Sequence, residues 1–266
     1  MSAHKLLPVA LLLSLSVIST AHAASCEKQS ATTRIPLVEL YTSEGCSSCP
    51  VADRWLSELA PEIVSADEMV ALAFHVDYWD RLGWKDRFAS PAYTERQKTN
   101  SKVNGSAFVF TPQIVLAGRN YEKWQDSKRV QQDVRKVLAV APDATLILRQ
   151  QPAMAGKLGF EVQAKLRQGV SPADVRIHTA LVQNGLVSNI SRGENSGSQL
   201  HHDYVVRSFV SSSALEQSGQ LSFKSSFTLP DDAQLEKMGV VVFAQDSKTG
   251  VVLQAMAAPL CAGEKL

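Results

Sequence analysis

The 266-residue sequence has little net charge, few cysteines and, after its first residues, no long apolar run. Lysine and arginine together number 27, and aspartate and glutamate number 26, so the formal net charge is +1. Without an excess of basic residues, the chain has no electrostatic signature for binding nucleic acid or an anionic membrane surface, and we expect neither partner. No second apolar run is long enough for a transmembrane helix, so we expect no membrane span.

Residues 1–23 have the pattern of a secretory signal peptide. They contain the basic Lys5, an apolar core from Leu6 to Ile18, and Ala21-His22-Ala23 as a small-residue cleavage site. Removal would leave about 240 residues, which suits two modest domains, in a periplasmic or secreted protein. Residues 24–34 would then form an N-terminal extension. A lipid anchor on Cys26 is disfavoured, because a lipid-bearing cysteine directly follows the cleavage point.

The chain has only four cysteines: Cys26, Cys46, Cys49 and Cys261. Disulfides persist outside the cytosol, and four cysteines allow three pairings. The close spacing of Cys46 and Cys49 favours pairing them with each other, which leaves Cys26 with Cys261. We expect the second pair to be a structural disulfide that holds the two ends of the mature chain together. Two free thiols are the alternative.

Residues 35–141 alternate between strand and helix signals. Buried strands are expected at residues 35–42, 69–77 and 112–117, with a short fourth strand at 121–124. Helices are expected from about residue 47 to Pro61, from Ser90-Pro91 to about residue 104, and from Asp126-Ser127 to Pro142. The Cys46-Ser-Ser-Cys49 segment lies between the first strand and the first helix. A helix N-terminus beside it would lower the pKa of the first thiol.

This order of elements, with Cys-x-x-Cys after the first strand and a proline opening the third, resembles the thioredoxin fold. The resemblance covers about residues 35–141 and implies that Cys46 is the attacking thiol and Cys49 the resolving one. It also implies that Pro112 is a cis-proline facing them, with Thr111 ahead of it.

The pattern departs from thioredoxin at one position. Six residues before the first cysteine, where thioredoxin has a buried acid, this chain has Leu40. The neighbouring Glu39 points to the other face of its strand. The residues therefore identify no proton acceptor for Cys49.

Longer segments carry a narrower resemblance. They are Val38-Glu-Leu-Tyr-Thr-Ser-Glu-Gly-Cys-Ser-Ser-Cys-Pro50, Phe74-His-Val-Asp-Tyr-Trp79, Tyr93 to Gln97, Thr111-Pro-Gln113, and Gly193-Glu-Asn195 with His202-Asp-Tyr-Val-Val-Arg207. Together they are similar to a secreted bacterial thioredoxin-like family known as domain of unknown function 1223. The similarity runs almost the length of the mature chain, and no activity comes with the name.

Residues 142–266 change to a strand pattern. Apolar residues alternate with polar or small ones from Leu158 to Leu166 and again from Leu221 to Leu229. Further strands are expected at residues 145–149, 176–183, 204–210, 239–244 and 251–257. About seven short strands without a helical period predict an antiparallel β-sandwich. We expect this domain to bind or position a redox partner, or to form a homodimer.

The chemistry that these residues favour is thiol–disulfide exchange with protein thiols or disulfides, with no cofactor. A thiolate is the attacking species, so the hypothesis needs Cys46 to be exposed and readily ionised. The alternative is a permanent Cys46–Cys49 disulfide that holds a turn in a non-catalytic binding protein.

Aromatic residues follow the second strand at the sheet edge where ligands collect in parallel α/β sheets. Tyr78, Trp79 and Trp84, with Thr111, are candidate substrate-binding residues. Alternatively, the rings simply pack under their loop. Two further aromatic residues, Phe108 and Phe110, could line a substrate groove or fill the core.

A metal carrier is a further alternative, in which Cys46, Cys49 and His75 would bind copper or zinc. A buried His75 that hydrogen-bonds Asp77 is the favoured interpretation of that histidine. Adjacent residues of a strand face opposite ways, so His201 and His202 are not expected to bind one ion. The His201-His202-Asp203 cluster closes a polar loop that begins at Ser188, and we expect it to carry loop chemistry or to contact a partner.

Overall fold

The computed structural model describes residues 26–59, 68–212 and 215–261. The expected signal peptide lies outside the described residues. Among the described residues, no helix has the length and apolar character needed to cross a membrane.

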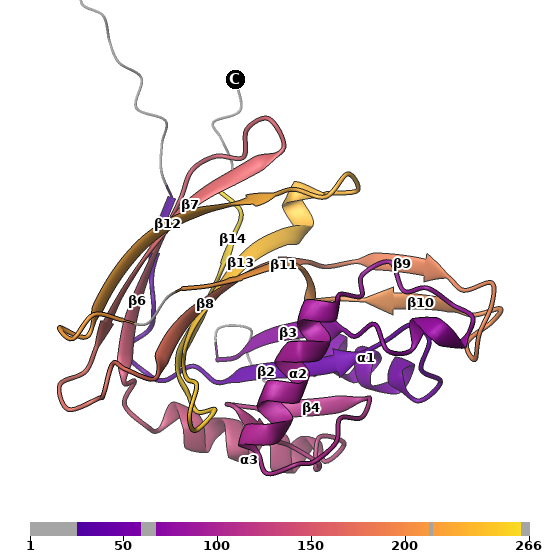
Figure 1. The fold of residues 1–266 in the computed structure, drawn as a ribbon, viewed down its shortest axis with the longest axis horizontal. Coiled ribbons are helices and arrows are strands. Elements are labelled where there is room, and N and C mark those ends of the chain that lie inside the picture. Colours follow the sequence, from indigo (N-terminus) through magenta and orange to yellow (C-terminus); the bar gives the residue numbers. More distant parts are fainter. Residues whose placement is uncertain (1–25, 60–67, 213–214, 262–266) are drawn as a thin grey trace, which may run out of the picture.

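An eight-stranded sheet forms the centre of the molecule (Figure 1). Its strands, in spatial order, are β14 (Val252–Pro259), β13 (Met238–Asp246), β8 (Val175–Gln183), β11 (Val205–Ser211), β3 (Val70–His75), β2 (Leu37–Thr42), β4 (Gln113–Leu116) and β5 (Arg119–Asn120). β3 is parallel to both β2 and β11, and Val205 pairs with Ala73. Strands from both halves of the sequence are therefore continuous in one sheet, and the domain boundary at residues 141/142 stays a prediction.

Three helices cover the β2–β3–β4 part of this sheet. α1 (Cys49–Glu58) and α3 (Ser127–Leu138) pack on one face, where Leu56 and Val134 contact the same cluster as Leu40. α2 (Pro91–Val103) covers the other face through Tyr93. Because both faces are covered, all six residues of β2 and of β3 are buried, as their apolar sequences predicted.

A second sheet packs against the other end of the eight-stranded sheet to form a β-sandwich. It has the order β1 (Cys26–Gln29), β6 (Ala144–Gln150), β7 (Lys157–Leu166) and β12 (Gln220–Thr228). In β13, Val240 and Val242 face this second sheet, whereas Phe243 faces the core beneath α2. The architecture is thus an α/β unit combined with a β-sandwich. The Cys26–Cys261 disulfide is present, with 5.6 Å between the Cα atoms.

A two-stranded hairpin, β9 (Leu186–Asn189) and β10 (Gln199–His202), extends beside α1 (Figure 1). The sequence interpretation placed a polar loop here, and that was wrong. Leu200 and His202 are buried while Gln199 and His201 are exposed, which is the alternation of a half-buried strand. The short strand expected at residues 121–124 was also misplaced, since β5 ends at Asn120.

Candidate functional site

The Cys-Ser-Ser-Cys segment lies between the end of β2 and the start of α1. Cys46 and Cys49 form a disulfide with 5.4 Å between their Cα atoms, and Cys49 is the first residue of α1. The Sγ atom of Cys46 lies 3.4 Å from the Oγ atom of Ser48. Both cysteines have 0% exposed surface. The expectation of an exposed Cys46 is therefore wrong for the disulfide form.

The segment from Glu44 to Cys49, here called the disulfide loop, is contacted by the loop between β9 and β10. The amide of Asn195 donates hydrogen bonds to the main-chain oxygens of Glu44, at 2.9 Å, and Cys46, at 3.0 Å. The carboxylate of Glu194 accepts a hydrogen bond from the Ser47 amide at 3.1 Å. Residues 193–195, here called the cover segment, thus attach the C-terminal half of the chain to the disulfide loop.

Trp84 connects the cover segment to Glu44. The indole N–H of Trp84 donates a hydrogen bond to the Glu44 carboxylate at 2.7 Å. Gly193 has a φ of +74°, and a Cβ atom there would lie 3.1 Å from the Cβ of Trp84. Glycine permits both this backbone conformation and the close approach of the Trp84 Cβ atom. Trp84 therefore helps to position the cover segment.

Trp79 connects the disulfide loop to the segment before β4. Its indole N–H donates a hydrogen bond to Thr111 Oγ1 at 2.8 Å, and a Cβ atom on Gly45 would lie 3.1 Å from the Trp79 Cβ. The Thr111–Pro112 peptide bond is cis. Tyr78 packs beside Trp79, with ring centroids 6.4 Å apart. The structure thus brings together four residues that the sequence placed near the cysteines.

Two aromatic side chains of the preceding loop face solvent. Phe108 is 70% exposed and Phe110 is 39% exposed. Of the two alternatives for these residues, filling the core is therefore excluded. Two exposed aromatic side chains thus lie in the segment just before Thr111.

A group of buried polar residues lies at the ends of β2 and β3. His75 Nδ1 is 2.7 Å from the Asp86 carboxylate, and neither side chain has exposed surface. The same carboxylate accepts hydrogen bonds from the main-chain amides of Glu44 and Phe88. The expected bond from His75 to Asp77 was wrong, because Asp77 instead accepts a hydrogen bond from Thr94.

His202 of β10 completes this group. Its Nε2 atom is 3.5 Å from Glu44 Oε1, its Nδ1 atom is 3.5 Å from Asp53 Oδ1, and its side chain is 2% exposed. The His75 and His202 rings meet edge to face, with centroids 5.0 Å apart. Thr42 Oγ1 donates a hydrogen bond to the other carboxylate oxygen of Asp53 at 2.8 Å. We call Glu44, Asp53, His75, Asp86 and His202 the buried polar cluster.

With this geometry in view, comparison with known proteins places the chain in a family. The family described as a protein of unknown function, DUF1223, matches residues 37–245. The chain belongs to this family. The match begins at β2 and ends in β13, so it includes both cysteines of the disulfide loop, the cover segment and the whole polar cluster of this DUF1223 protein. A comparison with curated proteins finds no match.

Two solved structures are similar to this DUF1223 protein. A structural-genomics protein from Agrobacterium tumefaciens is 24% identical with a TM-score of 0.61, over 89% of this chain and 98% of the other. HBP35 of Porphyromonas gingivalis is 12% identical with a TM-score of 0.67, over 89% of this chain and 79% of the other. At these identities the similarities show a shared fold and nothing about activity.

Electrostatics within the cluster couple its members. Burial alone would lower the pKa of His202, but the Asp53 and Glu44 carboxylates raise it to about 9. Burial would raise the pKa of Glu44, yet the ion-pair contact with His202 and hydrogen bonds from other groups leave it lowered. The pKa of Asp86 is likewise lowered, since the charge and hydrogen bond of His75 outweigh its burial.

The donor atoms that gather in this DUF1223 protein differ from the metal set considered from sequence. Cys46 and Cys49 are joined in a disulfide, so neither offers a thiolate in this form. In the described part of the chain, the group of three metal-ligating side chains is Asp53, His75 and His202. Sequence reasoning missed Asp53 entirely and assigned His202 to a surface loop.

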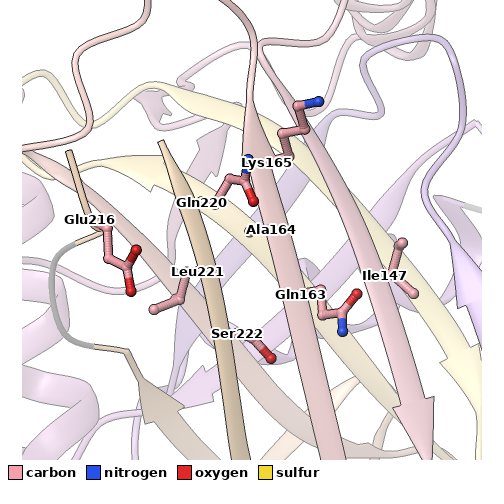
Figure 2. Close-up of a pocket in the computed structure, with 8 residues that line it drawn as sticks. All are labelled: Ile147, Gln163, Ala164, Lys165, Glu216, Gln220, Leu221 and Ser222. Atoms are coloured by element: carbon pink, nitrogen blue, oxygen red, sulfur yellow. The ribbon is translucent and has the colours of Figure 1, made fainter. Parts of the chain in front are cut away.

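One concave surface lies away from these residues. A pocket of about 450 Å³ on the second sheet is shown in Figure 2. It is lined by Ile147, Gln163, Ala164, Lys165, Glu216, Gln220, Leu221 and Ser222. Since it contains neither a cysteine nor a histidine, it offers none of the thiol or imidazole chemistry of the candidate site.

Proposed function

We propose that this protein is an exported, thioredoxin-like thiol–disulfide oxidoreductase whose reactive group is the Cys46–Cys49 pair. The observation that carries the proposal is the position of the disulfide, which joins the loop after the central strand β2 to the first turn of α1. The spatial order β3-β2-β4-β5, with β4 antiparallel to β2, supports the thioredoxin-like part of the proposal.

The proposed exchange transfers two electrons from the protein dithiol to the substrate disulfide. In the reduced protein, the Cys46 thiolate attacks a substrate disulfide, forms a mixed disulfide and releases one substrate thiolate, which takes up a proton. The Cys49 thiolate then attacks the Cys46 sulfur, releases the second substrate thiolate and re-forms the internal disulfide. The substrate is reduced and the protein oxidised. The reverse sequence oxidises a substrate dithiol.

Access to the sulfur requires a movement. Cys46 is fully buried and its main-chain oxygen is held by Asn195, so a protein substrate reaches it only when the cover segment moves away. The exposed Phe108 and Phe110, beside Thr111, offer an apolar surface for an extended substrate chain. Trp79 and Thr111 would then lie between that surface and the disulfide loop.

Single-cysteine variants test this function. The mature chain is reduced and mixed with a disulfide-bonded peptide, and the products are separated by mass after acid quenching. Cys46→Ser is expected to abolish exchange, whereas Cys49→Ala accumulates a mixed disulfide at Cys46. Ser47→Ala, in the same loop, serves as the matched control and exchanges like the wild type. If both cysteine variants exchange as the wild type does, the proposed function is wrong.

Burial of the disulfide favours one second candidate, a binding protein in which Cys46–Cys49 only holds the loop in place. Such a protein would keep its affinity for its partner when both cysteines are replaced by serine. The oxidoreductase would lose covalent capture of the peptide in the same double variant. The two candidates therefore give opposite results.

A further inference from the structure

We propose that Asp53, His75 and His202 form a binding site for one divalent transition-metal ion, with zinc as the ion that best suits two imidazoles and a carboxylate. The three ligand atoms lie within 4.8 Å of one another, and all three residues are buried. The ligands are His75 Nε2, His202 Nδ1 and Asp53 Oδ1. This site does not use the cysteines and does not depend on the proposed redox function.

Each ligand is oriented by a second group, as metal ligands in proteins commonly are. Asp86 contacts His75 Nδ1 at 2.7 Å, which fixes the proton there and leaves the lone pair of Nε2 free. Glu44 stands in the same relation to His202 Nε2, at 3.5 Å. Thr42 holds the other oxygen of Asp53.

The two carboxylates that contact the histidines are themselves fixed by hydrogen bonds. Two main-chain amides donate to Asp86, and Trp84 donates to Glu44. Thus both histidines have a positioned carboxylate behind them. A salt bridge alone would not require this arrangement, whereas carboxylate–histidine–metal triads contain it.

Several buried polar atoms in the site have no hydrogen-bond partner among the described residues. They are His75 Nε2, Glu44 Oε1 and both ring nitrogens of His202. Three of these atoms are in the 3.5 Å ion pairs of His202 with Glu44 and Asp53, whereas His75 Nε2 has neither a hydrogen bond nor an ion pair in the described part of the chain. An unpaired buried polar atom costs about 1–3 kcal/mol, so His75 Nε2 calls for a missing partner. A bound cation would directly satisfy the free nitrogen of His75 and one nitrogen of His202.

The charge of the cluster also favours a cation. Glu44, Asp53 and Asp86 are all buried, and in the described part of the chain their ion pairs are with His75 and His202 only. Three carboxylates outnumber the two imidazoles, so the cluster keeps a net negative charge even with His202 protonated. Buried charges are normally paired or coordinate a metal, so a divalent ion would offset most of this charge.

The spacing and access fit a metal. Zinc bonds of about 2.0–2.1 Å place neighbouring tetrahedral ligands about 3.3 Å apart, and His202 Nδ1 is already 3.5 Å from Asp53 Oδ1. A cavity of about 170 Å³ between α1 and β10 is lined by both Asp53 and His202. Because it borders two of the three ligands, we assign it as the path by which an ion and its water would enter.

Calorimetric titration with zinc tests the site. The full mature chain is stripped with a chelator and titrated with Zn²⁺, and the bound metal is counted by elemental analysis. The wild type is expected to bind one Zn²⁺ per chain, and His202→Gln and Asp53→Asn are expected to bind it at least about 100-fold more weakly. His201→Gln is the matched control, because His201 is exposed on the opposite side of the same strand. This variant should bind Zn²⁺ as the wild type does.

A second experiment uses the Cys46→Ser/Cys49→Ser double variant, which is expected to bind one Zn²⁺ with unchanged affinity. Loss of binding there would place the metal at the cysteines and overturn the proposal. Absence of stoichiometric binding by the wild type would also overturn it, and would leave His202 as an imidazolium shared by two carboxylates. Should His202→Gln fail to fold, the absorption spectrum of Co²⁺ bound to the wild type still tests the proposal, because it distinguishes nitrogen and oxygen ligands from thiolates. A thiolate spectrum would overturn the proposal.

Discussion

Removing the amide of Asn195 is expected to speed reduction of the Cys46–Cys49 disulfide. In Asn195→Ala, the main-chain oxygens of Glu44 and Cys46 each lose a buried hydrogen bond from the cover segment. At about 1 kcal/mol for each bond, the closed state is destabilised by about 2 kcal/mol relative to the open one. Because every 1.4 kcal/mol is a factor of ten, the open population and the reduction rate should rise about 30-fold.

The assay follows the native protein in dithiothreitol, with samples alkylated over time and the modified cysteines counted by mass. Asn189→Ala is the matched control, because it removes an exposed asparagine of the same hairpin whose bond is to Gln199. The control is expected to be reduced at the wild-type rate. An Asn195→Ala protein that is reduced no faster than the control would refute the idea that the cover segment limits access.

Three further predictions concern stability. The Cys26→Ser/Cys261→Ser variant should lose up to about 5 kcal/mol of unfolding free energy, because the disulfide closes a loop with a sequence separation of 235. An unchanged urea concentration at the unfolding midpoint would contradict this prediction. Arg96→Met should lower the unfolding free energy by about 3–5 kcal/mol, because it leaves the charge of the buried Glu39 carboxylate unpaired. Adding Glu39→Gln to the same chain should recover much of this loss. A loss of less than about 1 kcal/mol in Arg96→Met, as is typical of exposed ion pairs, would contradict the prediction. Partial burial, together with the nearby Arg96 charge, lowers the pKa of His178 in the folded chain. The unfolded chain therefore binds a proton at a higher pH than the folded one, and stability falls as the pH drops below about 6.5. His178→Gln should flatten this fall by up to about 1.4 kcal/mol per pH unit, and an equally steep loss of stability in acid, measured by urea unfolding, would disprove the assignment.

Local patterns predicted most of the elements of this fold. The period-2 pattern from Leu158 to Leu166 corresponds to β7, and Ser90-Pro91 does begin α2, with the Ser90 side chain accepting the Ala92 amide. What local patterns could not predict is the pairing of β11 with β3, which joins residues more than a hundred positions apart in one sheet. Strand pairing depends on tertiary packing, and periodicity reports only which residues face inward.

In the candidate site too, local features could be predicted from the sequence and tertiary ones could not. The spacing of Cys46 and Cys49 was enough to predict their bond, because only nearby residues are involved. His202 was missed because its burial depends on β10 pairing with β9 and packing on α1. The alternation of Leu200 and His202 with His201 was the available signal, and it was too short to outweigh the polar residues around it.

The reduction potential of the Cys46–Cys49 pair tests the central claim most directly. A chain of residues 24–266 is equilibrated with a series of thiol redox buffers, quenched with acid and alkylated. The fraction of disulfide is measured from both the reduced and the oxidised side. A redox-active pair predicts a reversible transition at a potential above about −300 mV. A disulfide that stays oxidised in buffers poised below about −300 mV would be structural, and would contradict the account.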